Sequence, residues 1–364
     1  MKKFLTVLVL VLVAASVLVA APKKKGKAGM IGLAMPETHV ERWQKDGAAL
    51  LADATAKGYK AEVAYGDADQ GKQNQQIQDF LTKGAKLLVI GSVNEGVVSA
   101  VADAARDGAI VIAYDRLITG SKDYDYYITF DNYKVGQFQG KAIEAALNLA
   151  AATKAAPKKI ALFAGSPTDN NAKVFFDGAI DVLRPYVEKG SLVIVGPAPL
   201  KSSDAAFTKI TTENWRADIA KARMENLLNN DAKKVVLDAI LAPNDTLARA
   251  IIEACASDAK YAKKLPVVTG QDGEVASIAA IRDGKQNMTV FKDTRKLAAA
   301  TIELADALLK GQTPSIAGAR LDTTSYDTGK KKVKAYLLEP VIVNKDNYKA
   351  VMIDSGYYKE SDIK

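Results

Sequence analysis

The sequence predicts an α/β protein with two doubly wound lobes, each built on a parallel sheet. Short apolar runs alternate with amphipathic helical stretches from residue 30 onward, and this alternation restarts near residue 158. Strands that are apolar on both faces and are separated by helices are typical of buried parallel sheets. A chain of 364 residues also has the length of two ordinary domains. We therefore expect two similar α/β halves with a cleft between them.

The first half contains four predicted strands connected by three predicted helices. Gly58, Gly84 and Gly108 follow the helices, as glycines at helix C-termini do. Parallel neighbours of this kind are joined by right-handed crossovers. The strands are expected at Met30–Met35, Lys60–Tyr65, Leu87–Ser92 and Ala109–Tyr114, and the helices at Glu41–Lys57, Gln73–Lys83 and Glu95–Arg106.

The second half repeats the pattern. Its last predicted helix has Leu297, Leu304 and Leu308 on one face, as a helix packed on a sheet requires. Residues 311–333 are polar and are interpreted as a connection, and Ala335–Val343 is strand-like again. The strands are expected at Lys159–Gly165, Leu192–Pro197, Val235–Leu241, Val267–Gly270 and Met288–Phe291, and the helices at Lys173–Lys189, Trp215–Asn229, Thr246–Ala256, Val275–Arg282 and Thr294–Lys310.

Composition excludes several classes of protein and site. The single Cys255 and the single His39 leave no intrachain disulfide, Cys-cluster metal site or multi-histidine site. The net charge of +8 raises the question of a nucleic-acid partner. Part of the excess lies in two lysine runs, at residues 23–27 and 330–334, and the first has no interleaved aromatic residues to stack on bases. We expect a solvated basic surface and no nucleic-acid partner.

No motif for a cofactor or a metal ion is present. The sequence has no G-x-x-x-x-G-K-[ST] pattern, and no G-x-G-x-x-G follows the first strand. A calcium loop starting at Asp67 would need glycine at its sixth position and glutamate at its twelfth, where the chain has Lys72 and Gln78. Cys255 lies on a predicted helix and is expected to be a small buried apolar residue. We therefore expect neither a cofactor nor a metal.

The N-terminus has the pattern of a secretory signal peptide. Lys2 and Lys3 precede an apolar run from Phe4 to Ala21 that ends in small residues. We expect cleavage after residues 1–21; the alternative is an uncleaved membrane anchor, since the run approaches spanning length. No cysteine follows the run, so lipid anchoring on an N-terminal cysteine is not expected. The predicted location is the periplasm or another extracytoplasmic space.

Polar and aromatic side chains follow many of the predicted strands. In open α/β sheets, ligands bind beyond the carboxyl ends of the strands. Carboxylates, amides and cationic side chains suit the hydroxyls of a sugar, and aromatic faces suit its C–H face. The alternative for each Asp or Asn at such a junction is a helix N-cap. The segments are 36–43, 114–116, 165–171, 175–178, 243–245, 270–272 and 291–293, with Trp215 at the start of a helix.

Taken in chain order, these and further segments resemble the type I periplasmic sugar-binding proteins. The similarity is to the xylose-binding and multiple-monosaccharide-binding branch, which serves ABC importers, and it covers essentially the whole chain after the signal peptide. The segments that carry it are Ala34–Pro36 with Arg42–Trp43, Tyr114–Ile118, Thr129–Asn132, Gly165–Ala172, Ala222–Leu228, Gly270–Asp272, Phe291–Arg295 and Asp354–Tyr358.

The resemblance implies a set of ligand-binding residues. Asn170 and Phe175 are alternatives to Asn171 and Phe176 in that set. Glu37, Thr38 and His39 depart from the family's first-loop pattern, and His39 is expected to be an exposed loop residue. The implied hydrogen-bonding residues are Arg42, Asp115, Arg116, Asn171, Asn244, Asp272 and Lys292, and the implied enclosing aromatics are Trp43, Phe176 and Trp215.

The resemblance also implies two lobes that close about three hinge crossings. The crossings are expected near Phe130–Asn132, near Asp293 and within Asp322–Lys334. The first lobe would then hold residues 28–131 and 293–325, and the second residues 132–292 and 326–364. The expected ligand is an aldose such as xylose, glucose, galactose or arabinose. The expected partners are an ABC permease, docked at the lobe tips, and a chemoreceptor as a further candidate, with the protein itself a monomer.

Other functions remain as alternatives. A carbohydrate-active enzyme could use Asp115 and Asp272 as paired carboxylates, although a ligand-binding aspartate has the same sequence signal. A protein of this fold could bind a non-sugar signal molecule, for example a furanosyl compound. A sugar-responsive repressor would need an N-terminal helix-turn-helix, where this chain has its predicted signal peptide. Binding without catalysis is the interpretation that the residues favour.

Overall fold

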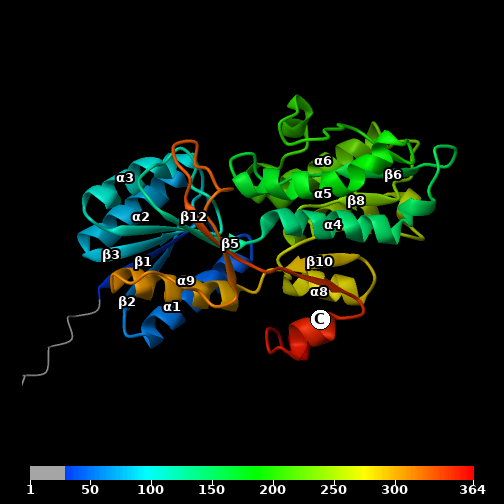
Figure 1. The fold of residues 1–364 in the computed structure, drawn as a ribbon. Helices are drawn as coiled ribbons and strands as arrows, with labels where there is room; N and C mark the ends of the chain where they lie inside the picture. Colours follow the sequence, from blue (N-terminus) through cyan, green and yellow to red (C-terminus); the bar gives the residue numbers. More distant parts are fainter. Residues whose placement is uncertain (1–28) are drawn as a thin grey trace, which may run out of the picture.

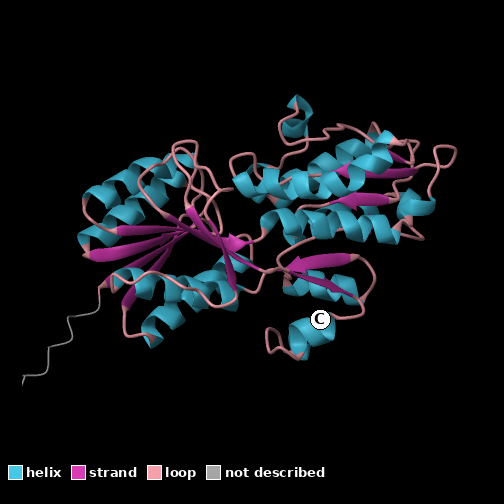
Figure 2. Ribbon diagram, viewed as in Figure 1, coloured by secondary structure: helices cyan, strands magenta, loops and turns pink. Residues whose placement is uncertain are grey.

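The computed structural model describes residues 29–364, which form two α/β lobes side by side (Figure 1). Each lobe contains a parallel sheet with helices on its faces, as Figure 2 shows, so the predicted fold class is confirmed. The predicted signal peptide, residues 1–21, lies outside the described residues. Within residues 29–364, no helix is both long and apolar enough to cross a membrane.

The first lobe is built on a seven-stranded sheet with the order β11-β12-β5-β4-β3-β1-β2. All neighbours are parallel except β11 and β12. Helices α1 (Arg42–Ala56) and α9 (Thr294–Leu309) cover one face, and α2 (Gln70–Thr82) and α3 (Val98–Arg106) cover the other. The strands are β1 (Met30–Met35), β2 (Lys60–Tyr65), β3 (Ala85–Ile90), β4 (Ile110–Tyr114), β5 (Tyr126–Phe130), β11 (Ala319–Asp322) and β12 (Lys334–Leu338).

The second lobe has a four-stranded parallel sheet with the order β7-β6-β8-β9. An antiparallel pair, β10 and β13, lies beside it, and a bridge between Gln271 and Val290 connects the two. The strands are β6 (Lys158–Leu162), β7 (Leu192–Ile194), β8 (Ala239–Leu241), β9 (Val267–Val268), β10 (Met288–Phe291) and β13 (Val341–Asn344). The helices are α4 (Asn132–Ala146), α5 (Asn170–Glu188), α6 (Ala217–Asn229), α7 (Asp245–Ala256) and α8 (Val275–Arg282).

The third chain crossing is not where the sequence placed it. Strand β12 pairs with β5 in the first lobe, whereas β13 pairs with β10 in the second. The chain therefore crosses at Glu339–Pro340, not within Asp322–Lys334, and residues 326–338 belong to the first lobe. The apolar sequence of residues 335–343 resembles a single strand. Pro340, however, has no N–H to donate within a sheet, and it divides the segment into two strands. The sequence also missed β5 and α4, and β11 lies in the segment interpreted as a connection.

Helices α4 and α5 pack with their backbones almost in contact. A Cβ atom on Gly136 would lie 2.0 Å from the carbonyl oxygen of Phe175. A Cβ on Gly178 would lie 2.2 Å from the carbonyl oxygen of Tyr133. Only glycine at both positions allows this approach, because real Cβ atoms do not come so close to backbone. The glycines thus determine where the first turns of α5 lie.

Replacing Gly136 by alanine is expected to lower the free energy of unfolding by about 2 kcal/mol or more, because α5 must move to admit the new methyl group. Urea denaturation followed by circular dichroism measures the change. Gly71→Ala in α2 is the control: a Cβ there meets only the exposed Asp69 side chain, at 3.2 Å, so that variant should be as stable as the wild type or slightly more stable. Equal stability of the two variants would contradict the packing argument.

Candidate ligand-binding site

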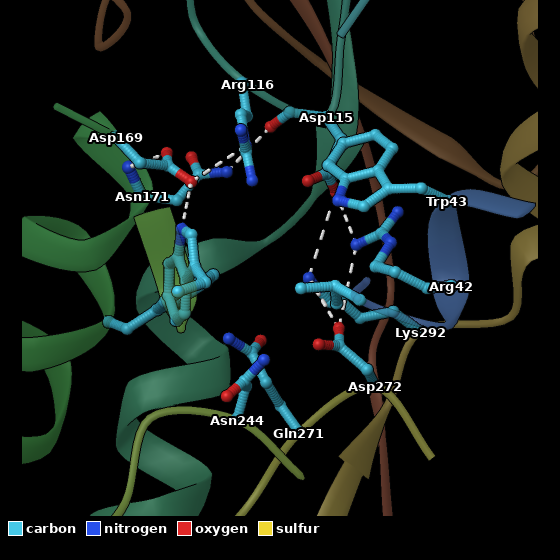
Figure 3. A pocket seen from close by; sticks show the side chains of 13 residues that line it. Arg42, Trp43, Asp115, Arg116, Asp169, Asn171, Asn244, Gln271, Asp272 and Lys292 are labelled. Carbon is cyan, nitrogen blue, oxygen red and sulfur yellow. Dashed lines mark hydrogen bonds and ion pairs between the residues drawn. The ribbon is translucent and has the colours of Figure 1, made fainter. Parts of the chain in front are cut away.

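A cavity lies between the two lobes, and thirteen side chains line it (Figure 3). The loops at the carboxyl ends of β1 and β4 supply the residues of the first lobe, together with the start of α1. The second lobe contributes the loops and helix starts that follow its own strands. The lining residues are Val40, Arg42, Trp43, Asp115 and Arg116 from the first lobe, and Asp169, Asn171, Phe175, Trp215, Asn244, Gln271, Asp272 and Lys292 from the second.

Arg42, in the first turn of α1, is held by carboxylates on three sides. Its Nε donates to Asp46 Oδ2 at 2.9 Å, and its Nη1 donates to Asp115 Oδ1 at 2.9 Å. The carboxylate of Asp272, from the other lobe, lies 3.7 Å from Nη1. Burial disfavours the charged guanidinium, but Asp115, Asp46 and Asp272 outweigh it and raise the pKa of Arg42. Tyr114 donates to the far oxygen of Asp46, which orients the whole group.

Asp115 follows β4 in a left-handed backbone conformation, with φ of 58°. Its carbonyl oxygen accepts hydrogen bonds from the Tyr127 hydroxyl at 2.7 Å and from Asn171 Nδ2 at 2.8 Å. The hydroxyl of Thr129 lies 3.2 Å from the same oxygen. Such a conformation costs free energy and persists only where the surroundings hold it. Burial works against ionisation of the side chain, but Arg42 and the other cations of the cavity more than offset it, so the pKa of Asp115 lies below its usual value.

Arg116 connects the two lobes directly. Its Nη2 donates to Glu37 Oε1 at 2.8 Å, and its Nη1 donates to the carbonyl of Ser92 at 3.1 Å, both in the first lobe. Its Nε lies 3.0 Å from Asp169 Oδ2 in the second lobe. Burial raises the pKa of Asp169, while Arg116 opposes that rise. The lobes are therefore closed on each other in this structure, with an ion pair across the cleft.

Lys292 and Asp272 form the wall of the cavity that faces Arg116 and Asp169 (Figure 3). The ammonium of Lys292 lies 3.1 Å from Asp272 Oδ1 and 3.8 Å from Asp115 Oδ1. Asp272 also has a left-handed backbone, with φ of 94°. Its N–H donates to Val290 O at 2.9 Å, which ties the loop to the strand that leads to Lys292.

Two tryptophans enclose the cavity. The ring of Trp43 has the guanidinium carbons of Arg42 and Arg116 at 4.9 and 5.0 Å from its centroid, so both cations contact the indole. The indole N–H of Trp215 lies 3.2 Å from Asp169 Oδ2. The Trp215 ring packs closely against Gly165, where a Cβ would lie 2.0 Å from the nearest ring atom. Both rings are thus fixed before any ligand enters.

The cavity carries balanced charge and unused hydrogen-bonding groups. Three cations, Arg42, Arg116 and Lys292, face three carboxylates, Asp115, Asp169 and Asp272. In the described part of the chain, Arg42 Nη2 and Gln271 Oε1 are buried without a hydrogen-bond partner. A buried polar atom without a partner is costly, so a ligand that supplies partners would be bound favourably. The arrangement suits an uncharged ligand with several hydroxyl groups.

Nine of the ten predicted site residues line this cavity, and Phe176 does not. Phe176 packs in the core of the second lobe, with its ring 5.1 Å from that of Phe207. Phe175 takes the cavity position instead. The signal that could have chosen it is helical spacing: Phe175 is four residues after Asn171 and so lies on the same face of α5. The sequence prediction also omitted Val40, Asp169 and Gln271.

Two residues that cap helices also line the cavity, so the two roles expected from the sequence do not exclude each other. Asp169 accepts a hydrogen bond from Asn171 N at the start of α5, and Asn244 accepts one from Leu247 N at the start of α7. Both side chains also line the cavity.

His39 is partly exposed, and its Nε2 lies 2.9 Å from the carbonyl oxygen of Asn214 across the cleft. Cys255 is buried, and burial raises the pKa of its thiol to about 12.

The geometry agrees with a family relationship. The periplasmic binding protein domain family matches residues 31–313. The chain belongs to the periplasmic binding protein family. The multiple sugar-binding periplasmic receptor ChvE of Rhizobium radiobacter is 42% identical over 347 residues, covering 94% of this chain and 95% of that protein. The D-xylose-binding periplasmic protein of Escherichia coli is 36% identical, covering 95% and 94% of the two chains. The resemblance found in the sequence is thereby confirmed.

Solved structures of periplasmic binding proteins have the same fold. An ABC transporter solute-binding protein of Clostridium phytofermentans, with bound β-D-glucose, is 40% identical with a TM-score of 0.84, covering 92% of this chain and 100% of that chain. A carbohydrate transporter solute-binding protein of Chloroflexus aurantiacus, in complex with D-glucose, is 35% identical with a TM-score of 0.81, covering 91% and 97% of the two chains. The two-lobed architecture is therefore that of the family.

Replacing Asp115 by asparagine is expected to lower the free energy of unfolding at neutral pH by roughly 3 kcal/mol, because Arg42 and Lys292 lose a buried counter-charge. The folded state lowers the pKa of Asp115, so its charge stabilises the protein fully above the unfolded carboxyl pKa of about 4 and loses this effect as the pH falls further. The difference between wild type and variant should be constant at neutral pH and shrink below about pH 4. Urea denaturation at several pH values measures it.

Asp218→Asn is the control for this experiment, since Asp218 forms an exposed ion pair with Arg216. Exposed pairs contribute little to stability, so this variant should match the wild type at neutral pH. If the loss of unfolding free energy caused by Asp115→Asn grew as the pH fell, the Asp115 carboxylate would not be stabilised by its cations.

Proposed function

We propose that this protein is an exported solute-binding protein that captures a monosaccharide for an ABC importer. The observation that carries the proposal is the closed cavity between the lobes, where three cations, three carboxylates and two tryptophans converge. Its ligand is an aldose such as xylose, glucose, galactose or arabinose. The protein acts by closing its lobes on the sugar, not by changing it chemically.

The chemistry of the cavity supports a sugar. Each hydroxyl of a sugar can donate to a carboxylate and accept from Arg, Lys or an amide. Asp115 and Asp272 offer acceptors, and Arg42 and Gln271 offer polar atoms that have no partner within residues 29–364. Tryptophan faces remove the C–H surface of the ring from water. Balanced charge among the lining side chains favours a neutral ligand.

The relatives support the same ligand class. ChvE is named for binding multiple sugars, and the two solved proteins described above hold glucose. The Escherichia coli relative is a xylose-binding protein. In our proposal the protein works in the periplasm or another extracytoplasmic space as a monomer, after removal of residues 1–21. It presents the tips of both lobes to a permease, and a chemoreceptor is a further partner for the closed form.

A glycosidase is the rival function, and the geometry speaks against it. In the pair Asp115 and Asp272, Asp115 is unsuited to be the general acid, because that role needs a raised pKa and the cations around Asp115 lower its pKa. Asp115 and Asp272 both contact Lys292, so the two carboxylates share one cation. This arrangement holds both oxygens as hydrogen-bond acceptors, which is what a binding site uses.

Calorimetric titration of the mature protein with xylose, glucose, galactose and arabinose tests the proposal. Heat of binding is expected with at least one of them, because the buried polar atoms gain partners. The absence of heat with all four would refute the monosaccharide proposal. Release of nitrophenol from nitrophenyl glycosides by the same preparation would favour the enzyme instead.

Asp272→Asn should weaken binding of the preferred sugar by roughly tenfold or more, because a charged acceptor is replaced by a neutral amide. Asparagine is the appropriate replacement, since it tolerates the left-handed backbone at this position better than alanine. Asp354→Asn, at an exposed position, is the matched control and should bind as the wild type does. Unchanged affinity in Asp272→Asn would show that this carboxylate does not contact the sugar.

A further inference from the structure

The C-terminal tail reaches the edge of the cleft, where it contacts both lobes. Residues 345–364 pack on α8, β10 and β13 of the second lobe, and Figure 1 shows this tail in red below α8. Tyr358, near its end, is almost fully buried. The sequence singled out Asp354–Tyr358 only as part of the family resemblance, and the proposed function assigns it no role.

The hydroxyl of Tyr358 lies at a junction between the lobes. It donates to the carbonyl of Gly273 at 2.8 Å, and it accepts a hydrogen bond from the ammonium of Lys45 on α1. Glu41, at the start of α1, lies 3.2 Å from the same hydroxyl and pairs with Lys45. The Lys45 ammonium also lies 4.1 Å from the centroid of the Tyr358 ring. We call Tyr358, Glu41 and Lys45 the C-terminal clasp.

The two ends of the clasp are adjacent to cavity residues. Gly273 follows Asp272, and both have left-handed backbones, with φ of 66° and 94°. On the other side, Glu41 directly precedes Arg42 and Trp43. One phenol oxygen thus connects the loop that presents Asp272 to the helix turn that presents Arg42. The carboxylate and the guanidinium of these residues lie 3.7 Å apart across the cleft.

Neighbouring contacts hold Tyr358 in place. The ring of Tyr357 packs at 4.9 Å from that of Tyr358 and at 4.6 Å from that of Phe291, which precedes Lys292. The hydroxyl of Tyr357 lies 3.0 Å from that of Thr294, at the crossing into α9. A Cβ on Gly273 would lie 2.8 Å from Phe291 and 3.0 Å from Met352, so the loop lies tightly against the tail. The tail is therefore packed against two cavity-bearing segments.

We propose that Tyr358 is a positioning residue for sugar binding, which couples the Asp272 loop to α1 and thereby holds the closed lobes together around the ligand. The inference rests on the proposed function. The Lys45 and Glu41 contacts with Tyr358 join opposite lobes, so opening must break them, whereas the bond from Tyr358 to Gly273 lies within the second lobe and survives opening. The clasp therefore acts on the rate at which the closed form opens and releases sugar, and much less on the rate of encounter.

Stopped-flow fluorescence with wild type and Tyr358→Phe tests this. The chain has two tryptophans, and both line the cavity, so intrinsic fluorescence reports binding. Sugar dissociation from Tyr358→Phe is expected to be roughly tenfold faster, with an association rate within about twofold of the wild type. Lys45→Met, which keeps the length of the side chain and removes its charge, should change the dissociation rate in the same direction.

Tyr186→Phe is the matched control. The Tyr186 hydroxyl donates to Glu144 within the second lobe, so its loss removes a comparable hydrogen bond without touching the cleft. Equal dissociation rates in Tyr358→Phe and Tyr186→Phe would overturn the proposal. A second pair of results would also overturn it: Tyr358→Phe is less stable to heat in the absence of sugar, and Lys45→Met releases sugar at the wild-type rate. In that case the tail only stabilises its own lobe.

The experiment separates this inference from the proposed function. If the wild type gives neither heat nor a fluorescence change with the four aldoses, the proposed function fails. The clasp is then judged by small-angle X-ray scattering of the sugar-free proteins. Tyr358→Phe should have a larger radius of gyration than the wild type and Tyr186→Phe, because its lobes open more often. Equal values for all three would overturn the clasp.

Discussion

Charge compensation in a closed, buried cavity is the constraint on which the site depends. Arg42 is buried, and its guanidinium is stable there only because Asp46, Asp115 and Asp272 surround it. Asp272 comes from the other lobe, so part of this compensation exists only when the lobes are closed. Within each lobe the charged side chains are already held by their neighbours, and closure of the lobes brings the two sets together around the ligand. Closure and recognition are therefore parts of one electrostatic arrangement.

Strained backbone delivers these charges to one place. Asp115, Asp272 and Trp215 all have positive φ, which non-glycine residues seldom adopt. The carbonyl of Asp115 is held by the Tyr127 hydroxyl and by the amide of Asn171, and the latter comes from the opposite lobe. Strain of this kind collects at functional sites because the surrounding structure maintains it. The side chains of all three residues line the cavity.

The accuracy of the sequence predictions follows from the range of the interactions involved. Strands β1 and β2 were predicted with their observed bounds, because an apolar run followed by a helical period is a local signal. Strand β5 and helix α4 were missed, and one apolar stretch was assigned to a single strand although Pro340 divides it between two lobes. Among the aromatics, Phe175 and Phe176 are adjacent in the chain, and only the orientation of α5 decides which one faces the cavity.

The sequence by itself determined the two-lobed α/β architecture, the family and most of the side chains that line the cavity. These features depend on local periodicity and on residues at the ends of strands. Both signals come from residues that are close together in the chain. The tertiary structure alone decided where the third crossing lies and that Asp169 pairs with Arg116. It also showed that Tyr358 reaches α1, 313 positions from Lys45 in the chain. Contacts at such separations depend on how the lobes pack, which no local pattern encodes.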